Sequence, residues 1–461
     1  MPVDRSRLPD VGPDPPFRFP RIVRHMLRNG LDVRTVEHYT VPVVSCVLLV
    51  HGGAGADPRN EEGLAALTAD MLDEGTGDLS AIDVSEGFAR IGAEYEVDVG
   101  ADAAQLGLTA LSRFIDRALS LLADIVIRPS LRSDDFERVR KLRLDRLRQL
   151  KDLPPALAER AFLRLLYGAH PYGHLPIGTE AALSVCRLER VAAFHAAVFR
   201  PARVTLVLAG PLSHDRLAAM AADAFGGWSE SGSQDGWRAG NVDPGYVPPR
   251  LAVIPRAGAA QSELRIGHLS APRTSPDYPA LLVMNAILGG QFVSRINLRL
   301  REEKGYTYSA RTGFDWRKGP GPFALQASVH TAATAESIRD TLVELGAIRD
   351  SRPPSDEEMA LAKASLTRGY PRHFETAPHI ARSVAQLALY GLPDSYFEEF
   401  TPRVAAVERD DVVQAARRHL DPERALTLIV GDYVAVGESL GPLGLGDPQI
   451  LPVTDSSSGT G

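Results

Sequence analysis

The sequence predicts an α+β fold of two homologous domains, each a mostly antiparallel sheet with helices packed on one face. Three observations lead to this prediction. Apolar runs such as VPVVSCVLLV, residues 41–50, are typical of strands, and amphipathic stretches such as LSRFIDRALSLLADIV, residues 111–126, are typical of helices. The third observation is an internal repeat, which divides the chain into two copies of one unit.

The repeat relates residues 191–210, VAAFHAAVFRPARVTLVLAG, to residues 412–431, VVQAARRHLDPERALTLIVG, without a gap and at an offset of 221. Each segment predicts a helix, a turn that contains proline, an apolar strand and a final glycine. A weaker match relates Leu72 to Leu288 in ALLVMNAILGG, at an offset of 216. The nearly constant offset indicates a duplicated domain.

Composition places the boundaries between the two copies. Residues 227–249 are rich in Gly, Ser, Asp and Pro and predict a linker. We therefore expect an N-terminal domain at 17–226 and a C-terminal domain at 250–440. The tail, residues 441–461, ends in DSSSGTG and is expected to be partly disordered.

Charge and hydropathy exclude several classes of function. The 461 residues include 51 basic and 58 acidic side chains, a net charge of −7, which argues against a nucleic-acid partner. The first twenty residues contain no apolar core of a signal peptide, and no run approaches the ~18 apolar residues of a membrane span. We expect a cytoplasmic protein with no membrane contact. Cys46 and Cys186 fit no metal or redox pattern and are predicted to be buried.

The stretch GLAALTADMLDEGT, residues 63–76, predicts a helix that buries one face and ends near Gly75. No side chain on it is suited to attack a bond. A second helix, ERVRKLRLDRLRQLK at 137–151, carries seven Arg or Lys residues. We interpret it as a solvated helix, while a membrane or nucleic-acid contact and a role in lining a cavity stay open. The residues expected to pack inward are Leu142, Leu144 and Leu147.

Two other motifs are weak. GESLG at 437–441 matches a nucleophile elbow, but the elbow needs a following helix and a later His, and PLGLGDPQILP follows instead. His170 and His174 in HPYGH are spaced like zinc ligands on a helix. Pro171 and Gly173 between them favour a structural loop. No H-E-x-x-H, inverted H-x-x-E-H, P-loop or dinucleotide glycine motif is present.

Residues better suited to binding or catalysis lie in the segment ILGGQFVSRINLRLREEKGYTYSARTGF, residues 287–314. Gly289 and Gly290 are expected to form a hinge. Ser294 is a candidate N-cap of a helix of about three turns, and Gly305 fits the position after its C-terminus. The following YTYSART alternates as a strand.

This turn is expected to bring Arg301 near Tyr308. A guanidinium and a phenol are donors suited to a carbonyl oxygen or a developing oxyanion. From the residues alone, the favoured explanation of this pattern is a surface ion pair and a packed tyrosine. Arg299 and Tyr306, also seven residues apart, are the alternative pair.

The segment L300-R-E-E-K-G-Y-T-Y308 resembles the C-terminal signature of the insulinase/pitrilysin family of inverted-motif zinc metallopeptidases, an L-R-E-K-x-G-x-x-Y type run. The HPYG stretch, the TLVLAG and TLIVG strands and the two-domain repeat extend the resemblance over most of the chain. It implies two homologous α+β domains that pair with two more domains to enclose a peptide chamber.

In active members of this family the first helix reads G-x-x-H-x-x-E-H-x-x-x-x-G-T. Here Ala66 stands at the first His, Ala69 at the catalytic Glu and Asp70 at the second His. The distal acidic ligand, some 76 residues on, falls near Arg146, with Asp145 beside it. Zinc needs three protein ligands and an open position, so the resemblance implies no metal and no cofactor in this chain.

The chain resembles most the zinc-less subunit of bacterial-type heterodimeric members of the family. The resemblance implies a partner subunit that carries zinc, and a peptide substrate. Tyr308 is then expected to contact the scissile carbonyl or its oxyanion, and Arg301 the peptide main chain. The alternative is a structural core-type subunit or a peptide-binding module without a role in catalysis. Whether the isolated chain forms a homodimer stays open.

Overall fold

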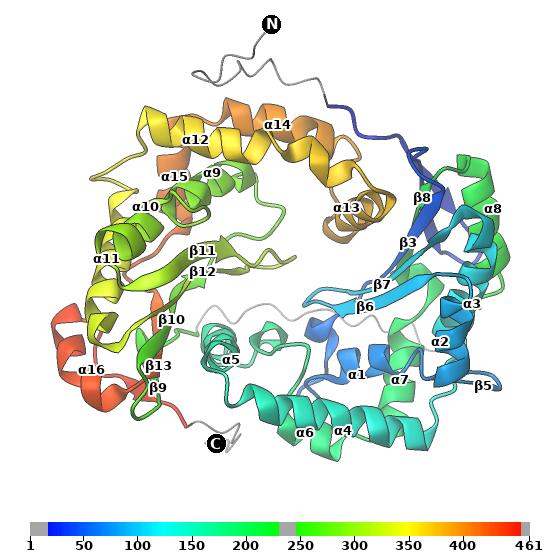
Figure 1. Cartoon of the computed structure of the whole chain (residues 1–461), viewed down its shortest axis with the longest axis horizontal. Helices are drawn as coiled ribbons and strands as arrows, with labels where there is room; N and C mark the ends of the chain where they lie inside the picture. Colours follow the sequence, from blue (N-terminus) through cyan, green and yellow to red (C-terminus); the bar gives the residue numbers. More distant parts are fainter. Residues whose placement is uncertain (1–16, 230–245, 453–461) are drawn as a thin grey trace, which may run out of the picture.

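The computed structural model describes residues 17–229 and 246–452, which form two six-stranded mixed sheets with helices around them (Figure 1). The α+β class and the presence of two sheet-containing halves are thereby confirmed. The centre of the expected linker and the end of the tail lie outside the described residues. No helix within the described ranges is long and apolar enough to cross a bilayer.

The first sheet has the strand order β1-β2-β8-β3-β7-β6. All neighbours are antiparallel except β2 and β8. The strands span β1 (Ile22–Met26), β2 (Asp32–Glu37), β8 (Val204–Gly210), β3 (Val43–Val50), β7 (Ala104–Leu111) and β6 (Glu94–Val99).

The second sheet, read from its other edge, repeats this order as β14-β9-β13-β10-β12-β11. Its parallel pair β9–β13 corresponds to β2–β8, and β14 adds a second parallel pair at the edge. The strands span β14 (Gln449–Ile450), β9 (Leu251–Pro255), β13 (Leu426–Gly431), β10 (Gln261–Leu269), β12 (Pro322–His330) and β11 (Thr307–Phe314). The first residues of the expected tail therefore reach the second sheet.

The segments of the sequence repeat occupy equivalent places. Helix α7 (Leu188–Val198) leads into β8, and helix α15 (Arg409–His419) leads into β13, with both helix boundaries displaced by the predicted 221 residues. The weaker match is also placed equivalently. Helix α1 (Leu64–Asp70) contacts α7, and helix α9 (Tyr278–Leu288) contacts α15.

The remaining helices follow the same division. The first half adds α2 (Ala81–Ala89), α3 (Ile115–Ile127), α4 (Ser133–Leu150), α5 (Pro154–Tyr167), α6 (Glu180–Val185) and α8 (His214–Phe225). The second half adds α10 (Arg295–Asn297), α11 (Thr334–Ala347), α12 (Asp356–Thr367), α13 (Ala377–Tyr390), α14 (Tyr396–Ala406) and α16 (Tyr433–Leu440).

Each half lends one helix to the sheet of the other half, which the sequence did not predict. Helix α13 packs on β3 and β8, and helix α5 packs on β10 and β13 (Figure 1). Alternate strand residues point to opposite faces, and both faces are apolar. Cys46 and Leu48 of β3 face the first half's own helices, whereas Val47 and Leu49 join the cluster that contains α13. Each sheet is therefore covered on one face by helices of its own half and on the other face by a helix of the other half.

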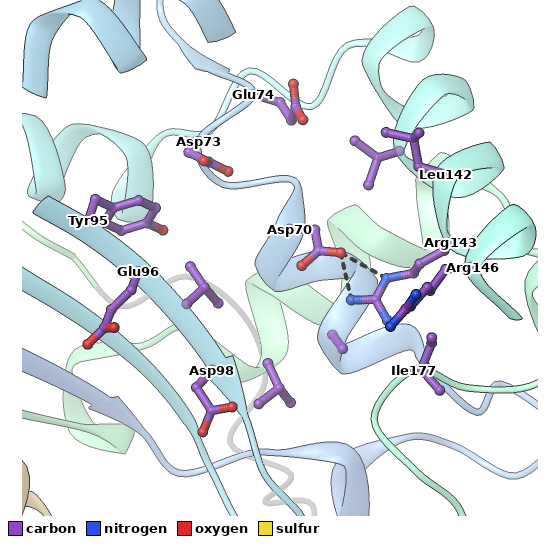
Figure 2. Close-up of a pocket in the computed structure, with 14 residues that line it drawn as sticks. Asp70, Asp73, Glu74, Tyr95, Glu96, Asp98, Leu142, Arg143, Arg146 and Ile177 are labelled. Atoms are coloured by element: carbon purple, nitrogen blue, oxygen red, sulfur yellow. Dashed lines mark hydrogen bonds and ion pairs between the residues drawn. The ribbon is translucent and has the colours of Figure 1, made fainter. Parts of the chain in front are cut away.

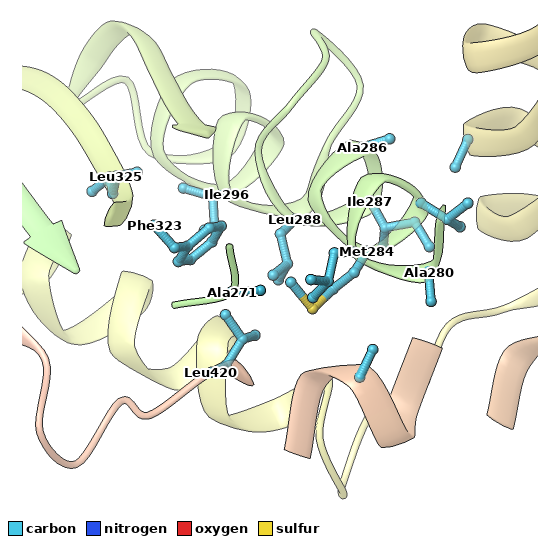
Figure 3. Packing of buried hydrophobic residues seen from close by; sticks show 14 of the residues in the cluster. Ala271, Ala280, Met284, Ala286, Ile287, Leu288, Ile296, Phe323, Leu325 and Leu420 are labelled. Carbon is cyan, nitrogen blue, oxygen red and sulfur yellow. The ribbon is translucent and has the colours of Figure 1, made fainter. Parts of the chain in front are cut away.

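The core of the second half is built around α9. Met284, Ile287 and Leu288 are at most 2% exposed and pack with Phe323 and Leu420 (Figure 3). Burial of one such side chain contributes about 1.5–3 kcal/mol. This apolar helix fixes the start of the segment that carries Arg301.

A loop of the second half also contacts the first half. The Arg317 guanidinium donates to the carbonyl of Tyr172 at 3.0 Å and lies over the Tyr167 and Tyr172 rings at 5.1 and 4.9 Å. The Lys318 amide donates to Asp102 at 2.8 Å. These contacts, with the exchanged helices, hold the halves in one arrangement.

Candidate functional site

Helix α1 begins on a buried carboxylate. Asp57 is 3% exposed and accepts from the amides of Gly63 and Ala65, both at 2.6 Å. His174 contacts the same carboxylate at 2.9 Å. Burial raises the pKa of Asp57, and its hydrogen bonds counteract that shift. Gly63 has φ of +100°, and a Cβ there would lie 2.8 Å from the Gly178 Cα, so the entry to α1 requires glycine.

The helix is shorter than its sequence suggests. It ends at Asp70, and Gly75 pairs with Ser80 in the short ladder of β4 (Gly75–Thr76) and β5 (Leu79–Ser80) rather than ending the helix. Ala66 and Ala69 are 3% and 0% exposed. Their methyl groups carry no donor atom for a metal, so the first ligand position and the base position cannot function.

The third position of the zinc motif is occupied by an ion pair. Asp70 accepts from the Nε and Nη2 atoms of Arg143 at 2.9 and 2.6 Å. Arg143 also donates to the carbonyl of Pro176 at 3.3 Å, and its side chain is only 13% exposed. The residue at the third motif position is therefore already bound to a cation, the Arg143 guanidinium.

Ala66, Asp70 and Arg143 line a cavity of about 650 Å³ between α1, α4 and the edge strand β6 (Figure 2). Arg146, the residue predicted at the distal ligand position, lies on this cavity beside Arg143. Leu142 also lines it and is 60% exposed, so the expectation that Leu142 packs inward is wrong. Leu147 is fully buried and Leu144 packs on the core, as expected. The basic helix therefore lines a cavity, one of the options left open by its sequence.

Sequence reasoning missed Arg143 because it counted 76 residues from Asp70 to Arg146. Residues three apart on a helix share a face, so Arg143 faces the same cavity from one turn earlier. A check of every cation within one turn of the expected position would have found it.

Carboxylates form the opposite wall of the cavity. Burial raises the pKa of Asp73 to about 6. Glu74 pairs with Arg138 of α4. Burial also raises the pKa of Tyr95, whose hydroxyl has no hydrogen-bond partner among the described residues. This wall is acidic and the α4 wall is basic.

None of this donor set fits zinc. Within residues 17–229 and 246–452 no three His, Cys, Asp or Glu side chains are grouped so that they could hold a metal ion. His170 and His174 have structural partners, because the Tyr172 amide donates to His170 at 3.0 Å and His174 bonds to Asp57. Ser439 lies inside α16, and its hydroxyl donates to the Val436 carbonyl at 2.6 Å, so it is not at a nucleophile elbow.

The two cysteines differ from each other. Cys46 is buried in β3, as expected, and burial raises the pKa of its thiol. Cys186 is only partly buried, so the prediction is wrong in part for this residue. It follows α6, where the chain turns toward α7.

In the second half, the helix that carries Arg301 is wound irregularly. After α10 the chain continues as a π-helix over Leu298–Glu303. Ser294 has the backbone conformation of an N-cap, but its hydroxyl is buried and makes no capping bond. Gly305 has φ of +65°, as expected at the helix end. A π-turn widens the helix and is often found at functional sites.

Gly289 and Gly290 are closely packed where a hinge was expected. A Cβ on Gly289 would lie 2.5 Å from the Thr312 Oγ1, and one on Gly290 would lie 2.5 Å from the Asn285 Nδ2. The Thr312 amide donates to the Gly289 carbonyl at 3.1 Å, which joins this turn to β11. Close approach of the backbone therefore accounts for glycine here.

Tyr308 is the most exposed tyrosine of this segment, at 83%. Arg301 lies over the Phe292 ring at 4.5 Å and contacts only its neighbour Glu302, at 3.3 Å, among the carboxylates described. Phe292 is itself 57% exposed. Both Arg301 and Tyr308 are therefore free to meet another molecule.

The alternative pair is more constrained. Arg299 is bound to Glu303 at 2.6 Å and to Asp340 of α11 at 3.2 Å. Tyr306 precedes β11 and packs partly buried against the second-half core. Within residues 17–229 and 246–452, Arg301 contacts Phe292 and Glu302 but not Tyr308, so the cooperation of Arg301 with Tyr308 stays a prediction.

Comparison with known proteins agrees with this geometry. The family model described as insulinase (peptidase family M16) matches residues 33–179, and the model of the peptidase M16 inactive domain matches residues 186–366. An uncharacterized zinc protease of Mycobacterium bovis is 27% identical, over 89% of this chain and 93% of its own length. A non-peptidase homolog of Helicobacter pylori is 22% identical, over 84% of this chain and 88% of its own.

A solved structure shares the fold. The crystal structure of a peptidase M16 inactive domain from Pseudomonas fluorescens superposes with a TM-score of 0.83 and 25% identity, over 89% of this chain and 98% of that one. Its coverage includes both sheets. The two family models, which together match most of residues 33–366, and this superposition show that the chain belongs to the insulinase, or peptidase M16, family.

Proposed function

We propose that this chain is the zinc-less subunit of a heterodimeric metallopeptidase. It contributes Arg301 and Tyr308 to a peptide-cleaving site whose zinc and general base belong to a homologous partner. The observation that carries the proposal is the contrast between the two halves. In the first half the Asp70–Arg143 pair replaces the metal, while in the second half Tyr308 is left exposed.

The first half supports a chain that is inactive alone. Two of the motif positions are buried alanines, and the third is held by Arg143. The Arg143 guanidinium holds Asp70 through two hydrogen bonds, at 2.9 and 2.6 Å. Zinc at this position would have to compete with Arg143 for the Asp70 carboxylate.

The second half supports a role in binding and oxyanion contact. A phenol fixed at a strand edge donates to a developing oxyanion, a contact that contributes most in the transition state. Arg301 stacks on Phe292 and keeps most of its donors free for a peptide carbonyl. Arg299 is held by two carboxylates, which favours Arg301 as the working residue.

The experiment has two steps. The purified chain is analysed for metal and assayed on a denatured protein substrate, and we expect no stoichiometric zinc and no cleavage. The chain is then used to capture its partner from its native cells, and the two purified subunits are mixed. Peptidase activity that neither subunit shows alone supports the proposal. About one tightly bound zinc in the isolated chain, with chelator-sensitive cleavage, contradicts it.

A further inference from the structure

A second pocket lies in the second half, away from the cavity at α1. It has a volume of about 240 Å³ and is formed by the segment before α9, the turn after α13, and α14. Its polar lining includes Arg273, Tyr278, Tyr396 and Arg403. No acidic side chain lines it. Neither the peptidase signature nor the proposed function uses these residues.

Arg273 is a buried cation without a carboxylate partner. It is 7% exposed, and no Asp or Glu of residues 17–229 or 246–452 lies within ion-pair distance of it. Its guanidinium lies over the Tyr278 ring at 3.8 Å and the Tyr396 ring at 4.8 Å. Burying a charge is costly unless it is paired. Aromatic faces offset part of that cost and leave the charge uncompensated.

The nearby carboxylates are engaged elsewhere. Asp277 is bound to Arg418 and His419, both at 2.8 Å. Asp394 is bound to Arg24, and Glu399 accepts from the Ser395 hydroxyl. Arg403, on the opposite wall, has no ion pair among the described residues either. The pocket therefore has two cations and no internal anion.

The hydroxyl groups add one more donor. Arg273 donates to the Tyr396 oxygen at 2.8 Å, and its guanidinium also lies over the Tyr278 ring. Arginine has donors only, so it cannot accept the Tyr396 proton. No other hydrogen bond of the Tyr396 hydroxyl is found among the described residues, so its phenolic proton is available to a ligand.

The remaining walls are apolar. Pro276, Pro279, Leu392 and Phe400 line the pocket beside the two cations. Such a combination selects a ligand that has an apolar body and one anionic end. A planar carboxylate matches the fork of an arginine, which can bind both of its oxygens.

We propose that this pocket binds a carboxylate carried on an apolar or aromatic group, either a small acid or the C-terminal residue of a peptide. Arg273 and the free phenolic proton bind the carboxylate, Arg403 closes over it, and the proline and phenylalanine walls hold the apolar body.

The test is calorimetric titration of the full chain, without its partner, in phosphate-free buffer. The probe is N-acetylphenylalanine, and its carboxamide is the matched control ligand. We expect one binding site for the acid and at least about tenfold weaker binding of the amide, because charge-assisted hydrogen bonds are lost. Equal binding of acid and amide, or no binding of the acid at millimolar concentration, overturns the proposal.

Variants locate the site. Arg403 is exposed and has no ion pair among the described residues, so Arg403→Gln should fold normally and bind the acid about fivefold or more weakly. Tyr396→Phe keeps the ring, and we expect a similar loss of affinity for the acid. Arg424→Gln is the control, because the Arg424 side chain is 82% exposed and does not line the pocket. Its affinity for the acid should equal that of the wild type. An unchanged affinity in Arg403→Gln overturns the assignment even if Tyr396→Phe does not fold.

Two further ligands define the chemistry. Inorganic phosphate that binds more tightly than the acid would overturn the carboxylate assignment. A longer peptide that ends in phenylalanine separates the two sources of the carboxylate. Retained affinity identifies a chain end, and lost affinity identifies a small acid; both outcomes support the pocket. Because no peptidase activity is measured, failure of this test leaves the proposed function unaffected.

Discussion

Helices α1 and α9 occupy equivalent places in the two halves, but they differ in length and in the site at their ends. Helix α1 has seven residues and ends at the polar cavity, where Asp70 is bound to Arg143. Helix α9 has eleven residues, is apolar, and is followed by the turn that leads to Arg301. Two sheets of the same strand order thus carry the Asp70–Arg143 ion pair in the first half and the exposed donor Tyr308 in the second half. The two sheets have the same strand order, and the two sites differ at the helix ends.

The largest effect is expected from a substitution of Tyr308, the exposed donor in the second half. In the complex with the zinc-bearing partner, Tyr308→Phe should lower kcat by ~10²–10³, the usual loss for one oxyanion donor, with little change in KM. The Tyr308 side chain is 83% exposed, so assembly should be unaffected. Steady-state kinetics on a quenched peptide measures the effect. Tyr306→Phe is the control, and full activity of both variants would favour the structural-subunit alternative.

The next effect is expected from breaking the Asp70–Arg143 ion pair in the first half. Asp70→Ala leaves the Arg143 guanidinium, whose side chain is 13% exposed, with only the Pro176 carbonyl. We expect a loss of about 2 kcal/mol in the free energy of unfolding, less than for a fully buried pair because Asp70 is 40% exposed. Urea denaturation measures it.

A double variant provides the control for this pair. Asp70→Leu with Arg143→Met removes both charges, so no buried cation is left unpaired, and stability should return close to that of the wild type. If Asp70→Ala alone proved neutral, the pair would be a surface contact, and the replacement of the metal by Arg143 would lose its support.

A smaller effect separates the two candidate arginines. Arg301→Ala should raise KM about fivefold, since one exposed, charge-assisted contact to the peptide main chain is lost. Arg299→Ala breaks the contacts to Glu303 and Asp340, so it should change stability slightly and KM not at all. A raised KM only in Arg299→Ala would transfer the role to the alternative pair.

The sequence predicted those features that depend on local pattern. The repeat placed α7 and α15 with the correct offset, because a helix, a turn and an apolar strand are each encoded within a few residues. It did not predict the exchange of α5 and α13, because an amphipathic helix specifies an apolar partner and not which sheet supplies it. Arg143 was missed for a different reason, because the count from Asp70 pointed to Arg146, one helical turn later. The sequence also did not predict the π-helix over Leu298–Glu303.

The last prediction compares two carboxylates, one in each half, by their pH dependence. Burial raises the folded-state pKa of Asp73 to about 6, from its ordinary value of 3.8. The folded chain therefore binds more protons than the unfolded chain between about pH 4 and 6, and this group lowers stability as pH rises through that window. Asp73→Asn cannot ionise, so its stability relative to the wild type should increase from pH 4 to pH 6 and then level off.

Asp432 is the matched control because its shift has the opposite sign. The Gly258 amide, at 2.8 Å, and the amides of Val434 and Ala435 lower its pKa below 3.8. Its stabilising contribution is complete above the unfolded value and is lost only as pH falls through the folded one. The difference between Asp432→Ala and wild type should thus be constant from pH 5 to 7, whereas that of Asp73→Asn changes between pH 5 and 6. Thermal denaturation across this range measures both differences. Parallel curves for Asp73→Asn and wild type would mean that Asp73 is solvated, and that the acidic wall of the cavity is open to water.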